Sequence, residues 1–468
     1  MSAVGELLKV AAFERSSSSL FDDNARARTH EESEWVLQLA NTQTGIYGLN
    51  TLTGHRDGEA FPQSVKNSQF RLIESHLVPS DAQYFGVYEA RCVGVAKIFA
   101  VRNGGTGLST PLVDHLLKAI DSPTFAPSIP KNQSYSSGDV IPAAHWAHAL
   151  IRWDGYIERM PLRPGEALGL INGSFVHLGI ASSLVPRLLA CGKILVYAFC
   201  ALACLSDRGE ADFGRIVFAE HTNALKDLET IKMAVRDYGG GRRTLATSPQ
   251  ASVSIRAIPE VIIAIREKID KYTSEINYGL NSQSANPLFN YKGRAIESQA
   301  SFLAPCLAID QSALLDCLLL VGATLAGGIQ FTLSGRAKGI PVDGGSQCDP
   351  FGFIQVPKEI IARLEQLRAA CAHRPFGSIG NTSFGIEDLW TNGLIVSENL
   401  RAAIETIDYI ALRVINVCEI LSHVFRQKKI FNEIRRNEGS TLMQLLTEKE
   451  NFLSGKIRRV AEADTKIF

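Results

Sequence analysis

Several short polar segments of the sequence hold side chains that can move protons or bind a carboxylate. Tyr47 stands in a Tyr-Gly-Leu-Asn stretch, and a phenol exchanges a proton near neutral pH only if its pKa is lowered. Arg256 carries the planar guanidinium that binds carboxylates bidentately. Both residues also have structural interpretations, as a surface-turn tyrosine and an exposed arginine at a helix start.

A Ser-Ser-Gly-Asp turn lies within residues 134–145, which run Ser-Tyr-Ser-Ser-Gly-Asp-Val-Ile-Pro-Ala-Ala-His. Acidic residues and proline are favoured in the first turn of a helix, so Asp139 and Pro142 predict that a helix begins there. By itself, the preceding triplet is typical of an ordinary turn and helix N-cap.

The order of these segments resembles the aromatic amino acid ammonia-lyase and aminomutase family, and most closely its histidine ammonia-lyase branch. Residues 134–145 are similar to the family stretch Ala-Ser-Gly-Asp-Leu-x-Pro-Leu-x-His. Six further blocks resemble family motifs in the same order: Tyr47–Gly54, Ser75–His76, Gly165–Ser174, Gln250 with Ser254–Pro259, Asn281–Leu288 and Ile386–Asp388. Seven coincidences in order, spread over most of the chain, favour membership over chance.

The resemblance implies a prosthetic group, methylidene-imidazolone, made by cyclisation of Ser136, Ser137 and Gly138. The glycine nitrogen attacks the carbonyl two residues earlier, and a residue without Cβ permits that approach. Loss of the Ser137 hydroxyl as water leaves the exocyclic methylidene. The first residue supplies only a carbonyl, so Ser136 in place of the usual alanine is compatible with the ring.

The resemblance also assigns site residues. It implies that Tyr47 is the catalytic acid/base and that Arg256 holds the substrate carboxylate. The remaining substrate-binding candidates are His76, Asn172, Gln250, Gln299 and Glu387. Asn281–Leu288 is interpreted as an architectural motif.

The chain departs from the family pattern on the substrate side. Val253 stands where the family has a tyrosine, and Gln299–Phe302 replaces Gly-Asn-Phe-His. Ser301 then removes an aromatic wall, and Gln299 is the candidate to replace the lost amide. Leu52 and Thr53 replace Gly-Phe in the tyrosine loop. These changes indicate an altered substrate or an impaired prosthetic group.

The sequence therefore predicts an ammonia-lyase-like enzyme that eliminates ammonia from an α-amino acid, either histidine-like or a larger polar analogue. His76 and Glu387 favour a polar side chain over phenylalanine. Two alternatives stay open: a 2,3-aminomutase, and a family member without the prosthetic group that does other chemistry or only binds a ligand.

Composition limits the partners. The 468 residues hold 48 basic and 48 acidic side chains, so bulk charge gives no reason to expect nucleic acid or an anionic membrane. Nine cysteines without a C-x-x-C pair favour a reduced, cytoplasmic protein. The apolar stretches Val176–Leu205 and Ser312–Leu333 are interrupted by charged residues, proline or glycine, which favours buried helices over membrane spans.

Long apolar periodicities predict the fold class as mainly α. Ile258–Ile276 and Asn399–Phe425 repeat apolar residues at helical spacing. The resemblance implies an aspartase/fumarase-like long-helix bundle with a loop-rich head, assembled as a homotetramer. We expect a loosely ordered lead-in at residues 1–34, an N-terminal domain at 35–175 and a bundle domain at 176–468.

Two other patterns are interpreted as structural. His145 and His148 form H-x-x-H, but no acidic or cysteine partner completes a metal site, so no metal is expected. Gly239–Arg243 could surround a phosphate, but no Walker-type Lys-Ser/Thr follows, so a loop is predicted.

We predict that the mature protein weighs two waters less than its translated mass, both lost within residues 136–138. Cyclisation releases one water and dehydration of Ser137 releases the other. Intact-mass measurement and peptide mapping decide this. An unmodified Ser137 peptide would favour the class without the prosthetic group.

Overall fold

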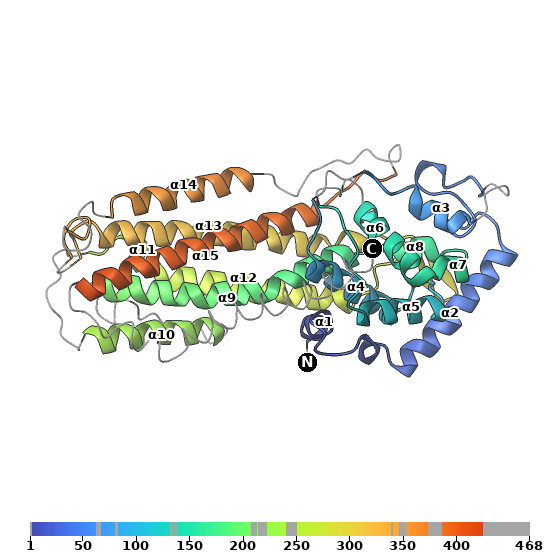
Figure 1. Cartoon of the computed structure of the whole chain (residues 1–468), viewed down its shortest axis with the longest axis horizontal. Coiled ribbons are helices and arrows are strands. Elements are labelled where there is room, and N and C mark those ends of the chain that lie inside the picture. Colours follow the sequence, from blue (N-terminus) through green and yellow to red (C-terminus); the bar gives the residue numbers. More distant parts are fainter. Residues whose placement is uncertain are drawn as a thin grey trace, which may run out of the picture.

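The computed structural model describes residues 2–61, 67–79, 83–131, 134, 138–206, 213, 222–239, 250–337, 340–345, 353–372 and 386–424. These residues form a long-helix bundle with a head of shorter helices at one end (Figure 1). The predicted mainly α class is confirmed.

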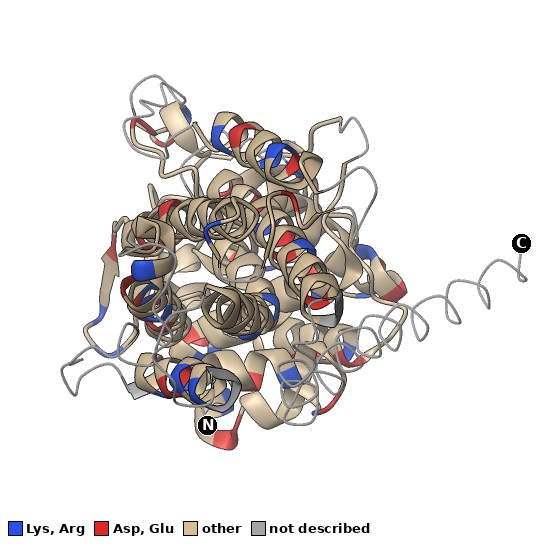
Figure 2. Ribbon diagram, turned by 90° about the vertical axis from the view of Figure 1, so that its left-hand side faces the viewer, with Lys and Arg blue, Asp and Glu red and all other residues tan. Residues whose placement is uncertain are grey.

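Four long helices pack lengthwise to form the bundle core: α9 (Phe175–Leu205), α12 (Ile258–Leu280), α13 (Pro305–Thr332) and α15 (Gly393–Val424). Two helices flank them, α10 (Thr222–Gly239) and α14 (Gln355–Ala370), and the short helix α11 (Val253–Arg256) lies at the end away from the head (Figure 1). Viewed end-on, Lys and Arg are interspersed with Asp and Glu on the helices (Figure 2), in keeping with the balanced charge.

The sequence periodicity explains which faces are buried. In α12, Ile262, Ile265 and Ile269 recur every three to four residues and are buried against the neighbouring helices. By length and composition, Glu166–Leu205 and Ser301–Thr332 could cross a membrane, but 83% and 67% of their most apolar windows are buried inside the protein. This burial is typical of core helices.

The head contains the remaining helices: α1 (Ala3–Ala11), α2 (Asp23–Thr42), α3 (Ser68–Glu74), α4 (Val87–Asn103), α5 (Thr110–Asp121), α6 (Val140–Arg152), α7 (Tyr156–Arg159) and α8 (Glu166–Ile171). One antiparallel hairpin joins β1 (Leu288–Asn290) to β2 (Ala295–Glu297). Short 3-10 turns lie at Ser17–Leu20, Gly54–Arg56, Trp153–Gly155 and Ser301–Leu303.

The structure differs from the loosely ordered lead-in expected for residues 1–34. α1 and the first half of α2 occupy most of this segment, and Val4, Leu7 and Val10 are buried. The Arg91 guanidinium of α4 donates to the carbonyls of Val10 and Ala11, which fixes the C-terminal end of α1. The polar run Ser16–Ser19, on which that expectation rested, is part of a 3-10 turn between the two helices. The two other domain boundaries stay predictions.

The head joins the bundle through a close helix crossing. A Cβ at Gly179 of α9 would lie 2.5 Å from Val93 Cα of α4, so the two backbones approach more closely than any side chain allows. This contact sets the start of α9 against the centre of α4. It thereby fixes the position of the loops that precede α9.

Candidate active site

Tyr47 begins a loop whose shape is set by its own side chains. Asn50 Oδ1 accepts from the Ile46 N–H at 2.9 Å, and Asn50 Nδ2 donates to the Gln43 carbonyl at 2.7 Å. Gly48 has φ +71, and a Cβ there would lie 2.0 Å from Leu168 Cδ1 of α8. Only glycine allows the loop to pack this closely on α8.

Buried polar side chains attach this loop and its neighbours to α8. Gln69 of α3 donates through Nε2 to the Gly48 carbonyl at 3.3 Å. Its Oε1 accepts from the N–H groups of Gly165 and Ala167, at 3.1 and 3.0 Å, which otherwise have no helical partner. The buried Glu166 carboxylate accepts from Ser109 N–H and Oγ–H. The tyrosine loop and the residue after α8 are therefore positioned by one rigid unit.

Gly138 lies where a side chain cannot fit. Its φ is +82, and a Cβ would be 2.9 Å from Phe302 Cδ2 and 3.6 Å from Asn172 Oδ1. A backbone of this kind, without Cβ and pressed against an aromatic ring, meets the requirement that cyclisation places on the third residue of the triplet. The residues present thus fit methylidene-imidazolone at Gly138. Ser136 and Ser137 lie outside the described residues.

Asp139 follows Gly138 and occupies the N-cap position of α6, so the predicted helix start is confirmed. Its φ is +54, and its buried carboxylate accepts from the Ser134 hydroxyl rather than from its own helix. Burial raises the pKa of Asp139, while His177 opposes that shift. The helix directs its positive end toward Gly138.

The amides of Asn172 and Gln299 are used within the chain. Asn172 Nδ2 donates to the Asn286 carbonyl at 2.7 Å, and its Oδ1 accepts from the Gly173 N–H at 2.8 Å. Gln299 Nε2 donates to the Ala285 carbonyl at 2.8 Å, and its Oε1 accepts from Ser301. Both amides hold the Asn281–Leu288 motif, as its architectural interpretation expects. Their assignment to substrate binding stays a prediction.

Lys97 is a fully buried lysine behind Asn172. Its Nζ donates to the Asn172 carbonyl at 3.2 Å and lies 4.2 Å from the centre of the Phe175 ring. Burial lowers the pKa of Lys97 to about 7, because the charged form loses its hydration. The hydrogen bond from the Lys97 amino group ties α4 to the turn that presents Asn172.

Tyr47 and Glu387 approach each other from distant parts of the sequence. Burial raises the pKa of the Tyr47 phenol, and the negative charge of Glu387 raises it further. The backbone N–H of Gly54 acts in the opposite direction by favouring the phenolate. Within a single chain the pKa of Tyr47 is therefore raised, whereas acid/base catalysis near neutral pH requires it to be lowered.

His76 lies at the end of α3, beside α6. Its Nδ1 is 2.8 Å from the Leu72 carbonyl. Two residues later, the Val78 N–H donates to His145 Nε2 at 3.3 Å, which accounts for that histidine without a metal. Among the described residues, no group of three or more His, Cys, Asp or Glu is placed to hold a metal ion.

Arg256 and Gln250 do not join the head. A Cβ at Gly327 of α13 would be 2.8 Å from Ser254 of α11. Gly327 is 22 positions beyond Pro305 at the head end of α13, which corresponds to about 33 Å of helix. α11 lies at this far end of the bundle (Figure 1), and its last residue, Arg256, is exposed.

Two residues near the triplet were not identified from the sequence. Phe302, not Ser301, faces the site, so an aromatic ring is present where its loss was expected. A residue-by-residue match of Gln299–Phe302 with the family stretch Gly-Asn-Phe-His places Ser301 at the family phenylalanine, so the role of Phe302 was not recognised. Lys97 could have been noticed as a single charge within the apolar run from Val93 to Phe99.

Comparisons with known proteins identify relatives named ammonia-lyase and aminomutase. The MIO-dependent tyrosine 2,3-aminomutase of Streptomyces globisporus is 27% identical over 325 residues, covering 59% of this chain and 58% of the aminomutase, so the match spans less than two thirds of that relative. A probable histidine ammonia-lyase of Thermoplasma acidophilum is 24% identical over 431 residues, 85% of this chain and 84% of the relative.

The fold resembles solved structures over nearly its full length. Ergothionase from Treponema denticola, described as an ergothioneine-degrading enzyme, superposes with a TM-score of 0.81 at 17% identity and covers 97% of both chains. This likeness establishes the predicted helical, aspartase/fumarase-like fold.

The family model for aromatic amino acid lyases matches residues 4–436, which is most of the chain. Together with relatives named ammonia-lyase and aminomutase, this match shows that the chain belongs to the aromatic amino acid lyase family of carbon–nitrogen lyases.

Proposed function

We propose that this protein eliminates ammonia from an α-amino acid with a polar side chain, using methylidene-imidazolone formed from residues 136–138. The observation that carries the proposal is the backbone at Gly138, where positive φ and the Phe302 ring leave room for no side chain. The group supplies an electrophilic carbon for the substrate amine, which turns a poor leaving group into a good one.

The chain's own residues would bind the substrate and move its proton. Tyr47 faces the same region as Glu387 and is the candidate to take the proton from the carbon next to the departing amine. Glu387 and His76 are polar handles for the substrate side chain. Phe302 borders Gly138 and limits the space beside it.

We further propose that Arg256 acts in the site of another copy of the chain. A carboxylate needs a cation, and Arg256 lies about 33 Å along the bundle from its own head. A guanidinium brought to Tyr47 by a second copy would also favour the phenolate and offset Glu387. An assembly in which head and bundle end of different copies meet, such as a homotetramer, satisfies both needs.

The alternative activity, that of a 2,3-aminomutase, would use the same site, because it differs from ammonia elimination in how long the intermediate is held. The alternative without the prosthetic group requires a substrate whose leaving group already departs easily, such as a quaternary ammonium. The fold relative named for ergothioneine degradation makes ergothioneine a useful member of a substrate screen.

Wild-type protein should release ammonia from at least one polar α-amino acid and act weakly or not at all on histidine, phenylalanine and tyrosine. Ser137→Ala should abolish this turnover and leave helical content and assembly unchanged, because it removes only the hydroxyl lost in dehydration. A screen of amino acids and betaines by ammonia or amine release, with product mass, tests both statements. Equal turnover by Ser137→Ala would exclude the electrophile, and robust turnover of plain histidine would contradict the expected preference for a larger polar analogue.

Glu387→Gln should lower the pKa of Tyr47, because a nearby negative charge disfavours the phenolate. If Tyr47 acts as the base, kcat rises with pH until the phenol is ionised, so the rising limb of the kcat profile should move to lower pH. Asp388→Asn is the matched control, since Asp388 is adjacent and exposed but is not among the charges that act on Tyr47. If the rising limb of the kcat profile stays in place or moves to higher pH, Tyr47 is not the base that takes the proton.

Tyr47→Phe and Arg256→Ala should each lower kcat/KM by at least about 10²-fold when assayed alone. Co-expression of the two variants should restore part of the activity, since some mixed assemblies contain a site with both residues intact. Tyr47→Phe with Ser137→Ala is the control that should not recover, because both defects lie on the head side. Failure of the first pair to complement, with mixed assemblies present by mass, would place Arg256 outside the shared site.

A further inference from the structure

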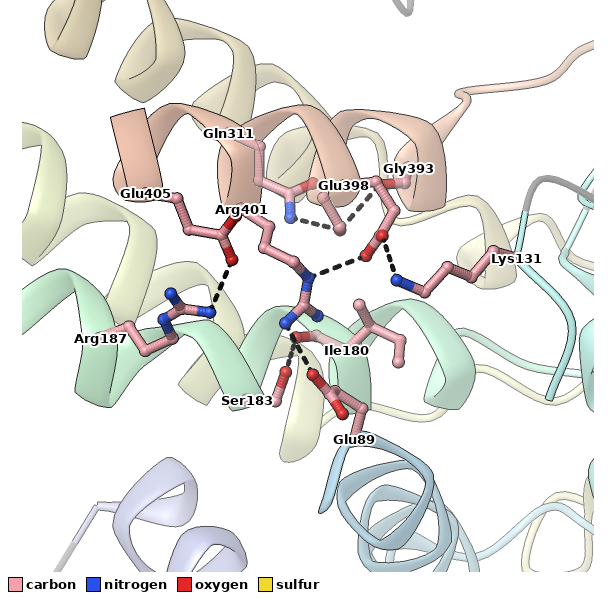
Figure 3. A network of polar contacts seen from close by, with 11 residues as sticks. Glu89, Lys131, Ile180, Ser183, Arg187, Gln311, Gly393, Glu398, Arg401 and Glu405 are labelled. Carbon is pink, nitrogen blue, oxygen red and sulfur yellow. Dashed lines mark hydrogen bonds and ion pairs between the residues drawn. The ribbon is translucent and has the colours of Figure 1, made fainter. Parts of the chain in front are cut away.

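Four charged residues form a partly buried network where the head meets the bundle (Figure 3). Lys131 Nζ is 2.8 Å from Glu398 Oε2, and Glu398 Oε1 accepts from Arg401 Nε at 3.1 Å. Arg401 Nη1 in turn donates to Glu89 Oε1 at 2.6 Å. The two cations balance the two carboxylates, and we refer to these four residues as the clamp.

The clamp is shielded from solvent more than an ordinary surface ion pair. The side chains of Arg401 and Glu89 are 15% and 16% exposed, and those of Lys131 and Glu398 are 25% and 20% exposed. Burial alone would lower the pKa of Arg401, but Glu89 and Glu398 outweigh it and raise that pKa. The guanidinium therefore stays charged and holds both carboxylates.

One side of the clamp holds Lys131, which stands seven residues before Gly138 in the sequence. The Lys131 N–H donates to the Gln83 carbonyl at 2.9 Å, and the Phe85 N–H donates to the Ile129 carbonyl at 2.9 Å. These bonds pair Lys131 with the segment that enters α4. Glu89 lies in the first turn of that same helix.

The other side of the clamp holds the chain that follows Glu387. Glu398 and Arg401 belong to the first turns of α15, which begins at Gly393. Thr391, just before that helix, donates through Oγ1 to the Leu303 carbonyl at 3.0 Å, next to Phe302. This bond joins the segment just before α15 to the residue that follows Phe302, whose ring lies against Gly138.

A second row of buried contacts fixes the same turn of α15. Gln311 Nε2 donates to Ser397 Oγ at 2.8 Å, and Gln311 Oε1 lies 2.8 Å from His177 Nε2 (Figure 3 includes the Gln311 contact). A Cβ at Gly393 would be 2.4 Å from His177 Cε1. α15 therefore has one position against α9 and α13, and the clamp transmits that position to Lys131.

We infer that Lys131 and Glu398 are positioning residues that align the Gly138 segment with the Glu387 segment for the reaction. The inference rests on the proposed function, because it assigns the clamp to that site. Misplacement of reacting groups by about 1 Å can cost about 10²-fold in rate, so a tie between the two segments has a direct kinetic consequence.

The same helix offers a matched control pair. Arg187 of α9 and Glu405 of α15 form an ion pair at 3.0 Å between side chains 34% and 52% exposed (Figure 3). It joins α15 to the bundle beyond the clamp and touches neither segment of the site. Substitutions at this more exposed pair control for the loss of a charged side chain on α15 that contacts neither segment.

The test uses Lys131→Met, Glu398→Gln and the double variant in the full-length assembled protein. These changes leave Arg401 paired with Glu89, whereas removal of Arg401 would leave the half-buried Glu89 carboxylate without its cation. Each single variant should lower kcat by at least about tenfold with little change in KM. The double variant should be no worse than either single one, because the two residues act as one contact.

Conservative replacement and the control pair complete the design. Lys131→Arg should retain most of kcat, since it keeps the charge facing Glu398. Arg187→Met and Glu405→Gln should keep kcat within about twofold, since exposed pairs contribute little. Equal losses of kcat in both pairs, or additive losses in the clamp double variant, would overturn the inference.

Two further measurements separate this inference from the proposed function. An unmodified Ser137 peptide in the wild type counts against the proposed function alone. Hydrogen exchange of the peptide covering residues 386–401 then tests the positioning role of the clamp without an activity assay. Faster exchange in Lys131→Met and Glu398→Gln, but not in the control pair, supports the clamp, and unchanged exchange contradicts it.

Discussion

The candidate site depends on a backbone that has no room for a side chain. At Gly138 the chain adopts a positive φ and passes within contact distance of Phe302 and Asn172. Because Gly138 has no side chain to pack against, the segments around it must be held in place by other contacts. Hydrogen bonds within the surrounding structure provide these contacts. Their geometry is strict, and a buried donor or acceptor left without a partner costs free energy.

Polar side chains, two of them buried and two half-buried, do most of this positioning. Gln69 joins the tyrosine loop to α8, Asn172 and Gln299 hold the Asn281–Leu288 motif, and Lys97 ties α4 to the end of α8. Each bond links segments far apart in the sequence. The head can therefore consist of short helices and loops and still present a defined set of groups.

The bundle has a different role, because it separates the candidate residues rather than gathering them. α13 begins beside Phe302 and ends near α11, so its length sets the distance between Gly138 and Arg256. A bundle of this length also carries exposed apolar side chains, among them Val253 and Leu320. These features fit an assembly in which the far end of one copy meets the head of another.

The sequence by itself determined the fold class, the order of the motifs and the start of α6, because apolar periodicity, glycine and helix-start residues act locally. It also indicated which residue types could do the chemistry. Only the tertiary structure decided which of them meet. It placed Phe302 rather than Ser301 against Gly138, brought Glu387 to Tyr47, and left Arg256 at the other end of the bundle. The physical reason is that a pKa or a contact depends on the groups around a side chain, and those groups come from segments that periodicity cannot bring together.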